Sequence, residues 1–337
     1  MENVFADLGN LTKGVVIHHW DTDGIVSAAM LRNYFHQQFP DKKLDLFMPT
    51  ITNYYLTDEQ YTYLQQQGYE FILTCDLNFP STTVQALAQR WPGQVYFFDH
   101  HHHPAPHENV HYFNMEHPAC ASHIAERLHL PYDLLPVIAM VGDREEGIQQ
   151  DKTYYPYVQE VMAEHSLTFS QLLEVRRLID SNYIVDDYEG ITETIQLLQD
   201  DPLSVFTDVR LRDNLTKIDA TISQLLEQPG QAIAPNVLFW DIQTNYNILS
   251  HVTRALSRQF PDKIIFTRQL KQEQHTCYIR RKDAQFDARD MIAYAHSLGL
   301  NSGGKPEVAG IIIPEVQLST VFPQIQAKLI ELSNVAK

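Results

Sequence analysis

Short apolar runs alternate with segments of helical periodicity in the first half of the chain. Strands are expected at residues 14–19, 70–75 and 95–98, with a helix at 25–35 after the first strand. The apolar segment 135–141 fits either a helix or a strand. This alternation predicts an α/β domain with a parallel sheet, and in such sheets the ligand site lies beyond the carboxyl ends of the strands.

The pattern of apolar positions changes after residue 150. Residues 151–230 have helical periodicity and end in the linker-like sequence Gln228-Pro229-Gly230. Beyond it, the strand-like segments are 236–240, 263–267, 276–280 and 309–313, and the helical segment is 288–298. We therefore expect an N-terminal domain at 1–150, a helical connector at 151–230, and a smaller C-terminal α/β domain with a mixed sheet at 231–337.

The length of 337 residues and a hydrophobic content of 44% support two domains with cores of their own. No apolar run reaches the roughly 20 residues that a membrane helix needs, and residues 1–10 lack the features of a secretory signal. Cys75, Cys120 and Cys277 share no metal-binding spacing and are expected to be reduced core residues. We expect a soluble, cytoplasmic protein that does not bind membranes.

Charge is distributed unevenly along this acidic chain, whose net charge is −17. Residues 1–150 carry 7 basic and 18 acidic residues, residues 151–250 carry 6 and 16, and residues 251–310 carry 10 and 6. The acidic balance disfavours a long nucleic acid partner, because phosphate binding depends on lysine and arginine. It is compatible with a short phosphorylated substrate held between a metal-loaded acidic region and a basic one.

The sequence HWDTDG at residues 19–24 follows the first predicted strand, with His18 directly before it. Side chains at alternate positions of an extended segment point the same way, so His19, Asp21 and Asp23 are expected to converge. Imidazole and carboxylate ligands suit Mn²⁺ better than Ca²⁺ or a thiolate zinc site. Gly24 then allows a tight turn into a helix. The alternative is a solvated turn that caps this helix.

Polar residues also follow the other apolar elements. Asp76 is a candidate to bridge two metal ions, and otherwise a cap or turn residue. In the run of Asp99 and histidines 100–103, one imidazole would bind a metal and the next would contact a phosphate; a solvated or nonspecific metal-binding loop is the alternative. Asp143 follows segment 135–141, where a helix cap is the alternative. Four clusters of acidic residues or histidines, each directly after an apolar element, favour one shared site.

This ordered set resembles the four motifs of the DHH phosphoesterase superfamily. The residues that carry the resemblance are HWDTDG, Asp76, DHH at 99–101 and GD at 142–143. The superfamily includes RecJ-type exonucleases, nanoRNases, cyclic-dinucleotide phosphodiesterases, exopolyphosphatases and family II pyrophosphatases. The two-domain layout and short chain resemble nanoRNases more than the larger RecJ exonucleases.

The resemblance implies a centre with two Mn²⁺ ions, for which Mg²⁺ or Co²⁺ are alternatives. The implied ligands are His19, Asp21, Asp23, Asp76, His100 and Asp143, with Asp76 bridging. His101 would contact the scissile phosphate and Asp99 would orient His100. Because the spacing within the first motif varies in the family, His18 is an alternative to His19.

The C-terminal part resembles the DHH-associated substrate domain of the same superfamily. Arg280, Arg281 and the glycine loop Gly303-Gly304-Lys305 would hold the distal end of the substrate. The family usually has histidine where this chain has Lys305, which can still bind a phosphate as a point charge. Adjacent strand residues face opposite sides, so only one of the two arginines is expected to reach the site.

We therefore expect a Mn²⁺-dependent phosphodiesterase that hydrolyses short single-stranded oligonucleotides or linear or cyclic dinucleotides with a metal-activated water. Alternatives are a phosphoanhydride hydrolase acting on polyphosphate or pyrophosphate, and a non-catalytic nucleotide-binding protein. An aromatic stacking site would favour nucleotides, and Tyr278 is one candidate. A homodimer is compatible with the sequence.

Overall fold

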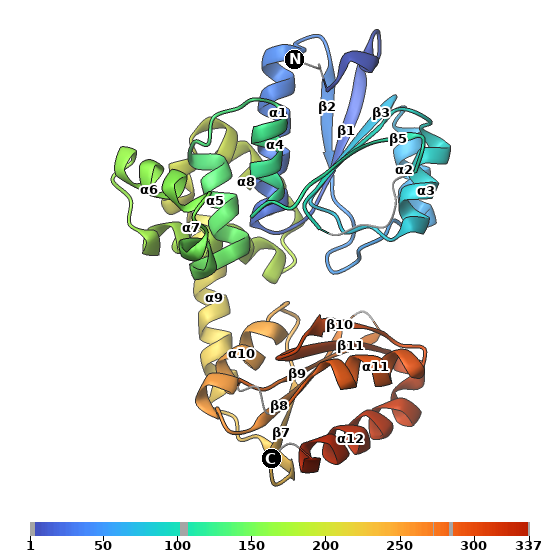
Figure 1. Cartoon of the computed structure of the whole chain (residues 1–337), viewed down its shortest axis with the longest axis vertical. Coiled ribbons are helices and arrows are strands. Elements are labelled where there is room, and N and C mark those ends of the chain that lie inside the picture. The colour runs from blue at the N-terminus through green and yellow to red at the C-terminus, as the bar shows by residue number, and fades with distance from the viewer. Residues whose placement is uncertain (1–3, 102–106, 272, 283–285, 336–337) are drawn as a thin grey trace. The chain divides into compact units, whose positions relative to one another are not determined.

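A computed structural model describes residues 4–101, 107–271, 273–282 and 286–335. The chain divides into two compact units, Met1–Leu215 and Thr216–Lys337 (Figure 1). His102 and His103 of the predicted histidine run lie outside the described residues.

The first unit is built on a five-stranded sheet whose strands are all parallel. The strands are β1 (Lys13–His18), β2 (Lys43–Phe47), β3 (Phe71–Cys75), β4 (Val95–Asp99) and β5 (Val110–Asn114). Their order is β2-β1-β3-β4-β5, which confirms the predicted parallel sheet. The order reverses direction between β1 and β3, and this switch point is where open α/β sheets bind their ligands.

Helices cover both faces of this sheet (Figure 1). They are α1 (Thr22–Gln38), α2 (Asp58–Gln66), α3 (Ser81–Arg90), α4 (Cys120–Arg127), α5 (Leu134–Arg144), α6 (Tyr155–Glu164), α7 (Phe169–Ile184) and α8 (Tyr188–Asp200), with 3-10 turns Ala6–Leu8, Glu145–Gln150 and Pro202–Phe206. Val16 packs in the core with α1, α4, α5, α7 and α8, whereas Val15 and Ile17 pack with α2 and α3. Burial on both faces explains the nearly continuous apolar character of β1.

The ambiguous apolar segment 135–141 belongs to helix α5. Asp133 caps this helix by accepting a hydrogen bond of 3.2 Å from the Leu135 N–H. Helix α7 packs against α5, and helix α8 packs against α1. Helix α9 (Val209–Leu226) contains the boundary between the two units. The domain limits predicted at residues 150 and 230 therefore stay a proposal.

The second unit contains a mixed six-stranded sheet, as predicted. Its strands are β6 (Gln231–Ala234), β7 (Val237–Ile242), β8 (Ile264–Lys271), β9 (Gln274–Arg280), β10 (Asn301–Lys305) and β11 (Val308–Pro314). The order is β10-β11-β9-β8-β7-β6, in which only β7 and β8 pair in parallel among the described strands. Its helices are α10 (Leu249–Gln259), α11 (Arg289–Ser297) and α12 (Leu318–Val335), with a 3-10 turn at Glu315–Gln317.

One element of the second unit differs from its predicted form. The glycine segment expected as a loop is strand β10, which forms an antiparallel hairpin with β11. Glycine has low strand propensity, so the local signal suggested a loop, and pairing with β11 overrides that preference.

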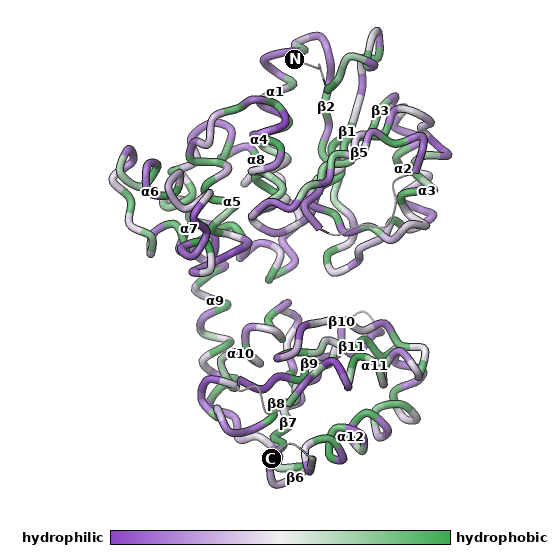
Figure 2. Tube along the Cα trace, viewed as in Figure 1, coloured by the Kyte–Doolittle hydropathy of each residue, from purple (hydrophilic) through white to green (hydrophobic). Residues whose placement is uncertain are grey.

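Apolar residues in both units lie mainly where the helices face the sheets (Figure 2). Among the described helices, none is both long enough and apolar enough to span a membrane.

Candidate metal centre

The predicted site residues follow three neighbouring strands at one edge of the parallel sheet. β1 ends at His18, β3 at Cys75 and β4 at Asp99, so His19, Asp76 and His100 come directly after adjacent strand ends. Asp143 reaches the same region from the last turn of α5. The sheet thus brings together residues that are up to 124 positions apart in the chain.

Three groups of side chains in this region have the spacing of metal ligands. In each, one nitrogen or oxygen per residue lies within 4.8 Å of the others. The groups are His19, Asp21 and Asp76; Asp23, His100 and Asp143; and Asp76, Asp99, His100 and His101. Asp76 and His100 each belong to two groups. All six predicted ligands therefore converge, and Asp76 has the central position that a bridging carboxylate needs.

His19, rather than His18, faces the cluster. Its Nδ1 lies 2.8 Å from an Asp21 carboxylate oxygen and 3.6 Å from Asp76. His18 Nδ1 lies instead 2.7 Å from the main-chain oxygen of His19. Burial lowers the pKa of His18 to about 4, so this ring is neutral and structural.

Asp21 and Asp23 converge in a different way from the one predicted. They do not alternate along an extended segment, because α1 already begins at Thr22. Asp21 caps the helix by accepting a hydrogen bond of 3.2 Å from the Gly24 N–H. Asp23 lies in the first turn and accepts hydrogen bonds from the Cys120 and Ala121 N–H groups at 2.6 and 2.9 Å. The turn therefore directs the two carboxylates into separate ligand groups.

Gly24 is required by a close approach of the chain to itself. A Cβ atom at this position would lie 2.5 Å from both the Cβ and the main-chain oxygen of His19. Real Cβ atoms do not come so close to other heavy atoms. The glycine thus lets the first turn of α1 fold against His19, which keeps this imidazole beside Asp21.

Asp76 is buried and has a strained backbone. Its φ of 58° lies in the left-handed region, which costs a non-glycine residue about 1–3 kcal/mol. Its N–H donates to the Phe98 carbonyl at 3.1 Å, which helps to hold this conformation. Burial, and then the charges of Asp23 and Asp21, raise the pKa of Asp76 well above its usual value.

Asp99 and the main chain of His117 hold the histidine motif. Asp99 lies 2.7 Å from His101 Nδ1 and also accepts hydrogen bonds from the N–H groups of His100 and His101. The ring of His100 is oriented instead by the main-chain oxygen of His117, 3.1 Å from Nδ1. Asp99 thus holds the main chain of His100 and the ring of His101, and its predicted role in orienting His100 stays a prediction.

Carboxylates surround the imidazole of His100, and the carboxylate of Asp143 also acts on the carboxyl group of Asp23. His100 Nε2 lies 3.2 Å from Asp143, 3.4 Å from Asp76 and 3.7 Å from Asp23. Burial alone would lower the pKa of His100, but the hydrogen bond to Asp143 and the nearby charges raise it to about 10. Burial, and then the charge of Asp143, raise the pKa of Asp23 to about 7.

The donor set fits divalent cations. Among the described residues, His19 Nε2 is buried and has no hydrogen-bond partner, and the groups nearest to His100 Nε2 are carboxylates, Asp143 at 3.2 Å and Asp76 at 3.4 Å. Leaving a buried polar atom without a partner costs about 1–3 kcal/mol, and a bound cation would supply the missing interaction. Carboxylate oxygens combined with imidazole nitrogens suit Mn²⁺ and related first-row metals.

The C-terminal candidates lie on the mixed sheet of the second unit. The register pairs Val308 with both Arg280 and Lys305, so these two cations share one face of the sheet. Arg281 is 5% exposed and follows on the opposite side. Burial, and then the charges of Arg254 and Arg258 on α10, lower the pKa of Arg280.

The same face of this sheet carries Tyr278 and Gly303, whereas Gly304 pairs with Ala309 on the opposite face. Gly303 pairs with Gly310, which pairs with Tyr278, and a Cβ at Gly310 would lie 3.8 Å from the tyrosine ring. Gly303, Gly304 and Lys305 are exposed. Their role in substrate binding stays a proposal.

Sequence reasoning missed two residues next to the metal centre. Asp180 on α7 accepts hydrogen bonds from Thr22, between two predicted ligands. Tyr54 stacks on His19, with ring centroids 5.6 Å apart. Neither belongs to a recognisable local motif, although Tyr54 is adjacent to a second tyrosine in a polar loop, which is an unusual place for two aromatic residues.

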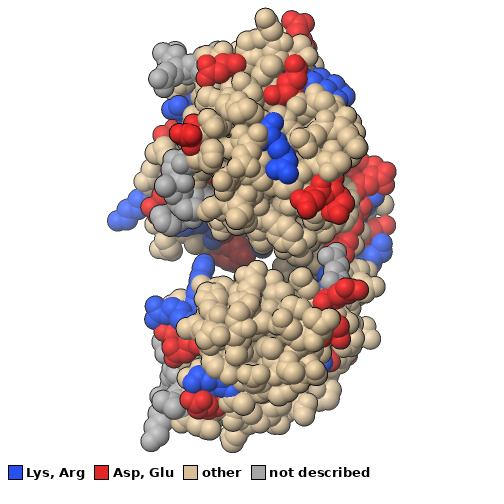
Figure 3. Space-filling view, turned by 90° about the vertical axis from the view of Figure 1, so that its right-hand side faces the viewer, with Lys and Arg blue, Asp and Glu red and all other residues tan. Residues whose placement is uncertain are grey.

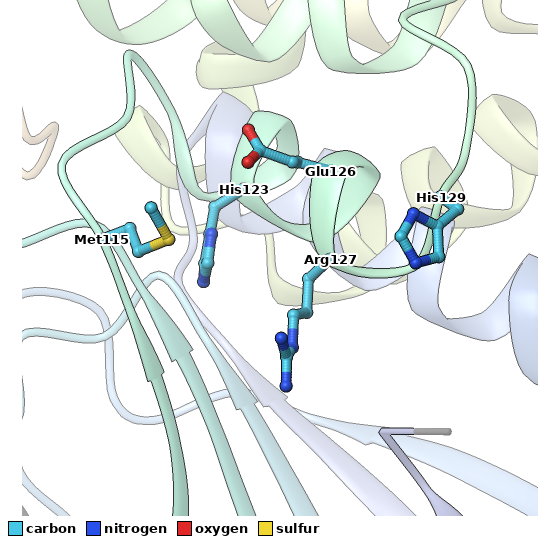
Figure 4. A pocket seen from close by; sticks show the side chains of 5 residues that line it. All are labelled: Met115, His123, Glu126, Arg127 and His129. Atoms are coloured by element: carbon cyan, nitrogen blue, oxygen red, sulfur yellow. The ribbon is translucent and has the colours of Figure 1, made fainter. Parts of the chain in front are cut away.

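A cavity of about 280 Å³ lies elsewhere in the first unit, beside α4 and the end of β5. It is lined by Met115, His123, Glu126, Arg127 and His129 (Figure 4). Figure 4 shows His123 and Arg127 pointing the same way, with Glu126 turned aside. None of the predicted ligands lines this cavity.

Comparisons with known proteins concern the family of the first unit and the fold of the chain. The model of the DHH family, N-terminal domain, matches residues 13–151. No curated protein matches the sequence. The fold is similar to that of RecJ from Thermus thermophilus, solved with Mn²⁺, with 16% identity and a TM-score of 0.68. That match covers 96% of this chain and 53% of RecJ, so the chain spans about half the length of this relative.

Two other solved structures match along nearly their whole length. An exonuclease RecJ bound to manganese is 19% identical, with a TM-score of 0.62 and coverage of 96% of this chain and 93% of that one. A pGpG-specific phosphodiesterase from Vibrio cholerae is 13% identical, with a TM-score of 0.51 and coverage of 97% and 100%. At these identities, the likeness establishes the fold.

Proposed function

Residues 13–151 are a domain of the DHH superfamily, and from this premise we propose that the chain is a Mn²⁺-dependent phosphodiesterase that hydrolyses short oligonucleotides or dinucleotides. The observation that carries the proposal is the convergence of six carboxylate and imidazole side chains, among them the buried Asp76. Metal binding in the solved relatives supports it, since two RecJ structures contain manganese.

The residues of the centre divide into two groups under this proposal. His19, Asp21 and Asp76 would hold one ion, and Asp23, His100 and Asp143, with Asp76, would hold the other. Two divalent ions in such a centre supply an activated water near neutral pH and stabilise charge on the phosphoryl oxygens. Asp76 is only 2% exposed, so bulk water competes little for its carboxylate oxygens.

His101 is the residue proposed to contact the scissile phosphate. Its Nδ1 is held by the fully buried Asp99, and its side chain is 41% exposed. With Nδ1 donating to Asp99, Nε2 is directed away from that carboxylate and is accessible to a ligand. A protonated ring would donate a hydrogen bond through Nε2 to a phosphoryl oxygen as the charge on that oxygen increases.

Tyr54 favours a nucleotide substrate over polyphosphate. It is 46% exposed, and its ring stacks on His19 and packs against Trp20 at a centroid distance of 5.3 Å. A nucleobase attached to the reacting phosphate could stack on an aromatic ring in this position, whereas polyphosphate has no group to place there. The similarity to a pGpG-specific phosphodiesterase is compatible with this substrate class.

Activity measurements with Mn²⁺ on Tyr54→Ala test this substrate class. The substrates are dinucleotides, single strands of about 24 nucleotides, cyclic dinucleotides, 3′,5′-bisphosphoadenosine and polyphosphate. Base stacking contributes about 1–3 kcal/mol, so kcat/KM for dinucleotides should fall about 5- to 150-fold. Tyr55→Ala is the matched control, since Tyr55 is equally exposed, and it should change kcat/KM less than about twofold.

Three results would oppose the proposal. Equal losses of kcat/KM on all substrates in Tyr54→Ala would mean that the ring only supports His19. Saturating activity confined to polyphosphate would instead favour a phosphoanhydride hydrolase. A parent protein that turns over none of these substrates with Mn²⁺ would leave the non-catalytic nucleotide-binding protein as the better assignment.

A further inference from the structure

Helix α7 contacts the metal centre although it lies outside residues 13–151, which match the family model. We propose that Asp180 and Arg176 on this helix are positioning residues that hold the two ligand-bearing segments, Asp21–Asp23 and Asp143, in register for metal binding. The inference deepens the proposed function, because it concerns the same metal centre.

The first contact of α7 is with Thr22, which lies between the two ligands of the first motif. One oxygen of Asp180 accepts hydrogen bonds from the Thr22 N–H at 2.9 Å and from its hydroxyl at 2.7 Å. Thr22 is 2% exposed and Asp180 is 4% exposed. Because Asp21 and Asp23 belong to different ligand groups, a shift of Thr22 would displace ligands of both.

The second contact links Asp180 to the end of α5. Arg176 Nε lies 3.2 Å from the other Asp180 oxygen, and its Nη1 lies 3.2 Å from Glu145. Glu145 comes two residues after Asp143 and has a φ of 46°, where α5 ends. Arg176 therefore bridges the carboxylate that holds Thr22 to the turn that follows the Asp143 ligand.

The two ligand-bearing segments are also in direct contact. A Cβ at Gly142 would lie 2.9 Å from the Thr22 methyl group, so only glycine lets α5 approach Thr22 this closely. The methyl packing brings Asp143 near Asp23, and the α7 network holds Thr22 from the other side. Together these contacts explain why a helix without any predicted ligand is packed against the site.

The test compares Mn²⁺ affinity among variants of this network. Isothermal titration calorimetry would measure affinity, and electron paramagnetic resonance would detect the spin coupling of two neighbouring Mn²⁺ ions. We expect Asp180→Asn, Arg176→Gln and Thr22→Val each to weaken Mn²⁺ binding about 10- to 100-fold and to diminish the coupled signal. Thr22→Ser keeps the hydroxyl that donates to Asp180 and loses only the methyl group, so it should weaken Mn²⁺ binding less than Thr22→Val does.

Arg210→Gln is the matched control. Arg210 makes a bidentate pair with Asp187 at 2.6 and 2.7 Å, at the start of the neighbouring helix α8, and contacts none of the predicted ligands. Its removal should lower thermal stability without weakening Mn²⁺ binding. This variant separates loss of positioning from general loosening of the helical region.

Parent-like affinity and coupling in Asp180→Asn and Thr22→Val would overturn the inference, as would equal weakening in Arg210→Gln. If a variant does not fold, Thr22→Val decides the matter, because valine is nearly isosteric with threonine and keeps the methyl group beside Gly142. A parent protein that binds no Mn²⁺ would overturn the proposed function and this inference together, whereas binding by the parent and by all variants would overturn this inference alone.

Discussion

At the residue scale, two carboxyl groups of the candidate metal centre, Asp76 and Asp23, resist ionisation in the folded protein when no metal is bound. The pKa of Asp76 is well above its usual value, and that of Asp23 is raised to about 7, each chiefly by burial and then by neighbouring carboxylates. A carboxyl group with a raised pKa stabilises the fold while it is protonated, and this contribution is lost as the pH rises through the folded-state pKa. Near neutral pH, the centre therefore stores repulsion that a cation would relieve.

Replacing Asp76 by asparagine should separate stability from metal binding. Without metal, Asp76→Asn removes the free-energy cost of burying an ionisable carboxyl group among other carboxylates, so its Tm should equal or exceed that of the parent, by about 2–4 °C for each kcal/mol relieved. The increase in Tm on adding Mn²⁺ should be lost, and hydrolysis should fall at least about 100-fold. Thermal unfolding with EDTA or Mn²⁺ measures the effects on Tm, and a turnover assay measures the loss of hydrolysis.

Asp41→Asn, in an exposed turn, is the control for this comparison and should behave as the parent. A lower Tm for metal-free Asp76→Asn, with the Mn²⁺-induced increase retained, would remove Asp76 from the centre.

The affinity for Mn²⁺ should rise with pH. Asp23 keeps its proton below a pKa of about 7 and His100 keeps its second proton below a pKa of about 10, and each must release a proton to bind a metal. Between about pH 6 and pH 9, each proton displaced should change the affinity by up to tenfold per pH unit. Calorimetric titrations in buffers with different ionisation enthalpies would count the released protons; an affinity independent of pH would contradict this assignment.

At the scale of elements, the start of α1 organises the first motif. The helix begins at Thr22, so its first turn carries Asp23 while its cap carries Asp21. The N–H groups at the start of α4 hold Asp23, and the charge of a carboxylate there is stabilised by the helix dipole. The end of β1 and the starts of α1 and α4 therefore fix the positions of Asp21 and Asp23, which a single extended segment would leave less restrained.

Gly24→Ala tests the close approach of α1 to His19. The added methyl group would lie 2.5 Å from His19 atoms, so the turn must open. We expect a loss of about 1–3 kcal/mol in the free energy of unfolding and weaker Mn²⁺ binding. Gly147→Ala is the control, because a Cβ there would have no neighbour within 4 Å. Chemical denaturation and Mn²⁺ titration measure the two effects; equal results for both variants would contradict the role of Gly24.

At the scale of the whole molecule, the net charge of −17 disfavours long nucleic acids as substrates of the proposed activity. On the face shown in Figure 3, the described lysines and arginines form separate small patches among acidic residues and uncharged surface. Within each unit, the described residues on this face form no continuous basic track for the phosphates of a long strand. Short substrates that depend on local contacts suit this charge distribution better.

Salt dependence and substrate length test this view. We expect kcat/KM for a dinucleotide to change less than about threefold between roughly 50 and 200 mM salt, because few phosphates are neutralised by the protein. A strand of about 24 nucleotides should be the poorer substrate at low salt, where repulsion is least screened. Tight binding of the long strand with a loss of about 10³-fold or more over this salt range would contradict a short-substrate enzyme.

The sequence by itself determined the parallel and mixed sheets and the set of residues that the centre brings together. Strand and helix periodicity is local, and polar residues directly after apolar runs mark strand ends, so His19, Asp76 and His100 could be found without a structure. Strand β10 was missed because sheet pairing overrides the low strand propensity of glycine.

Only the tertiary structure decided how the residues divide between two ligand groups and what holds them there. The contact of Asp23 with Cys120 spans 97 residues and that of Thr22 with Asp180 spans 158. The partner of Asp99 also depended on how the chain turns beyond β4. Such contacts follow from how separate helices pack against the sheet, and no periodicity or spacing within one segment records that packing.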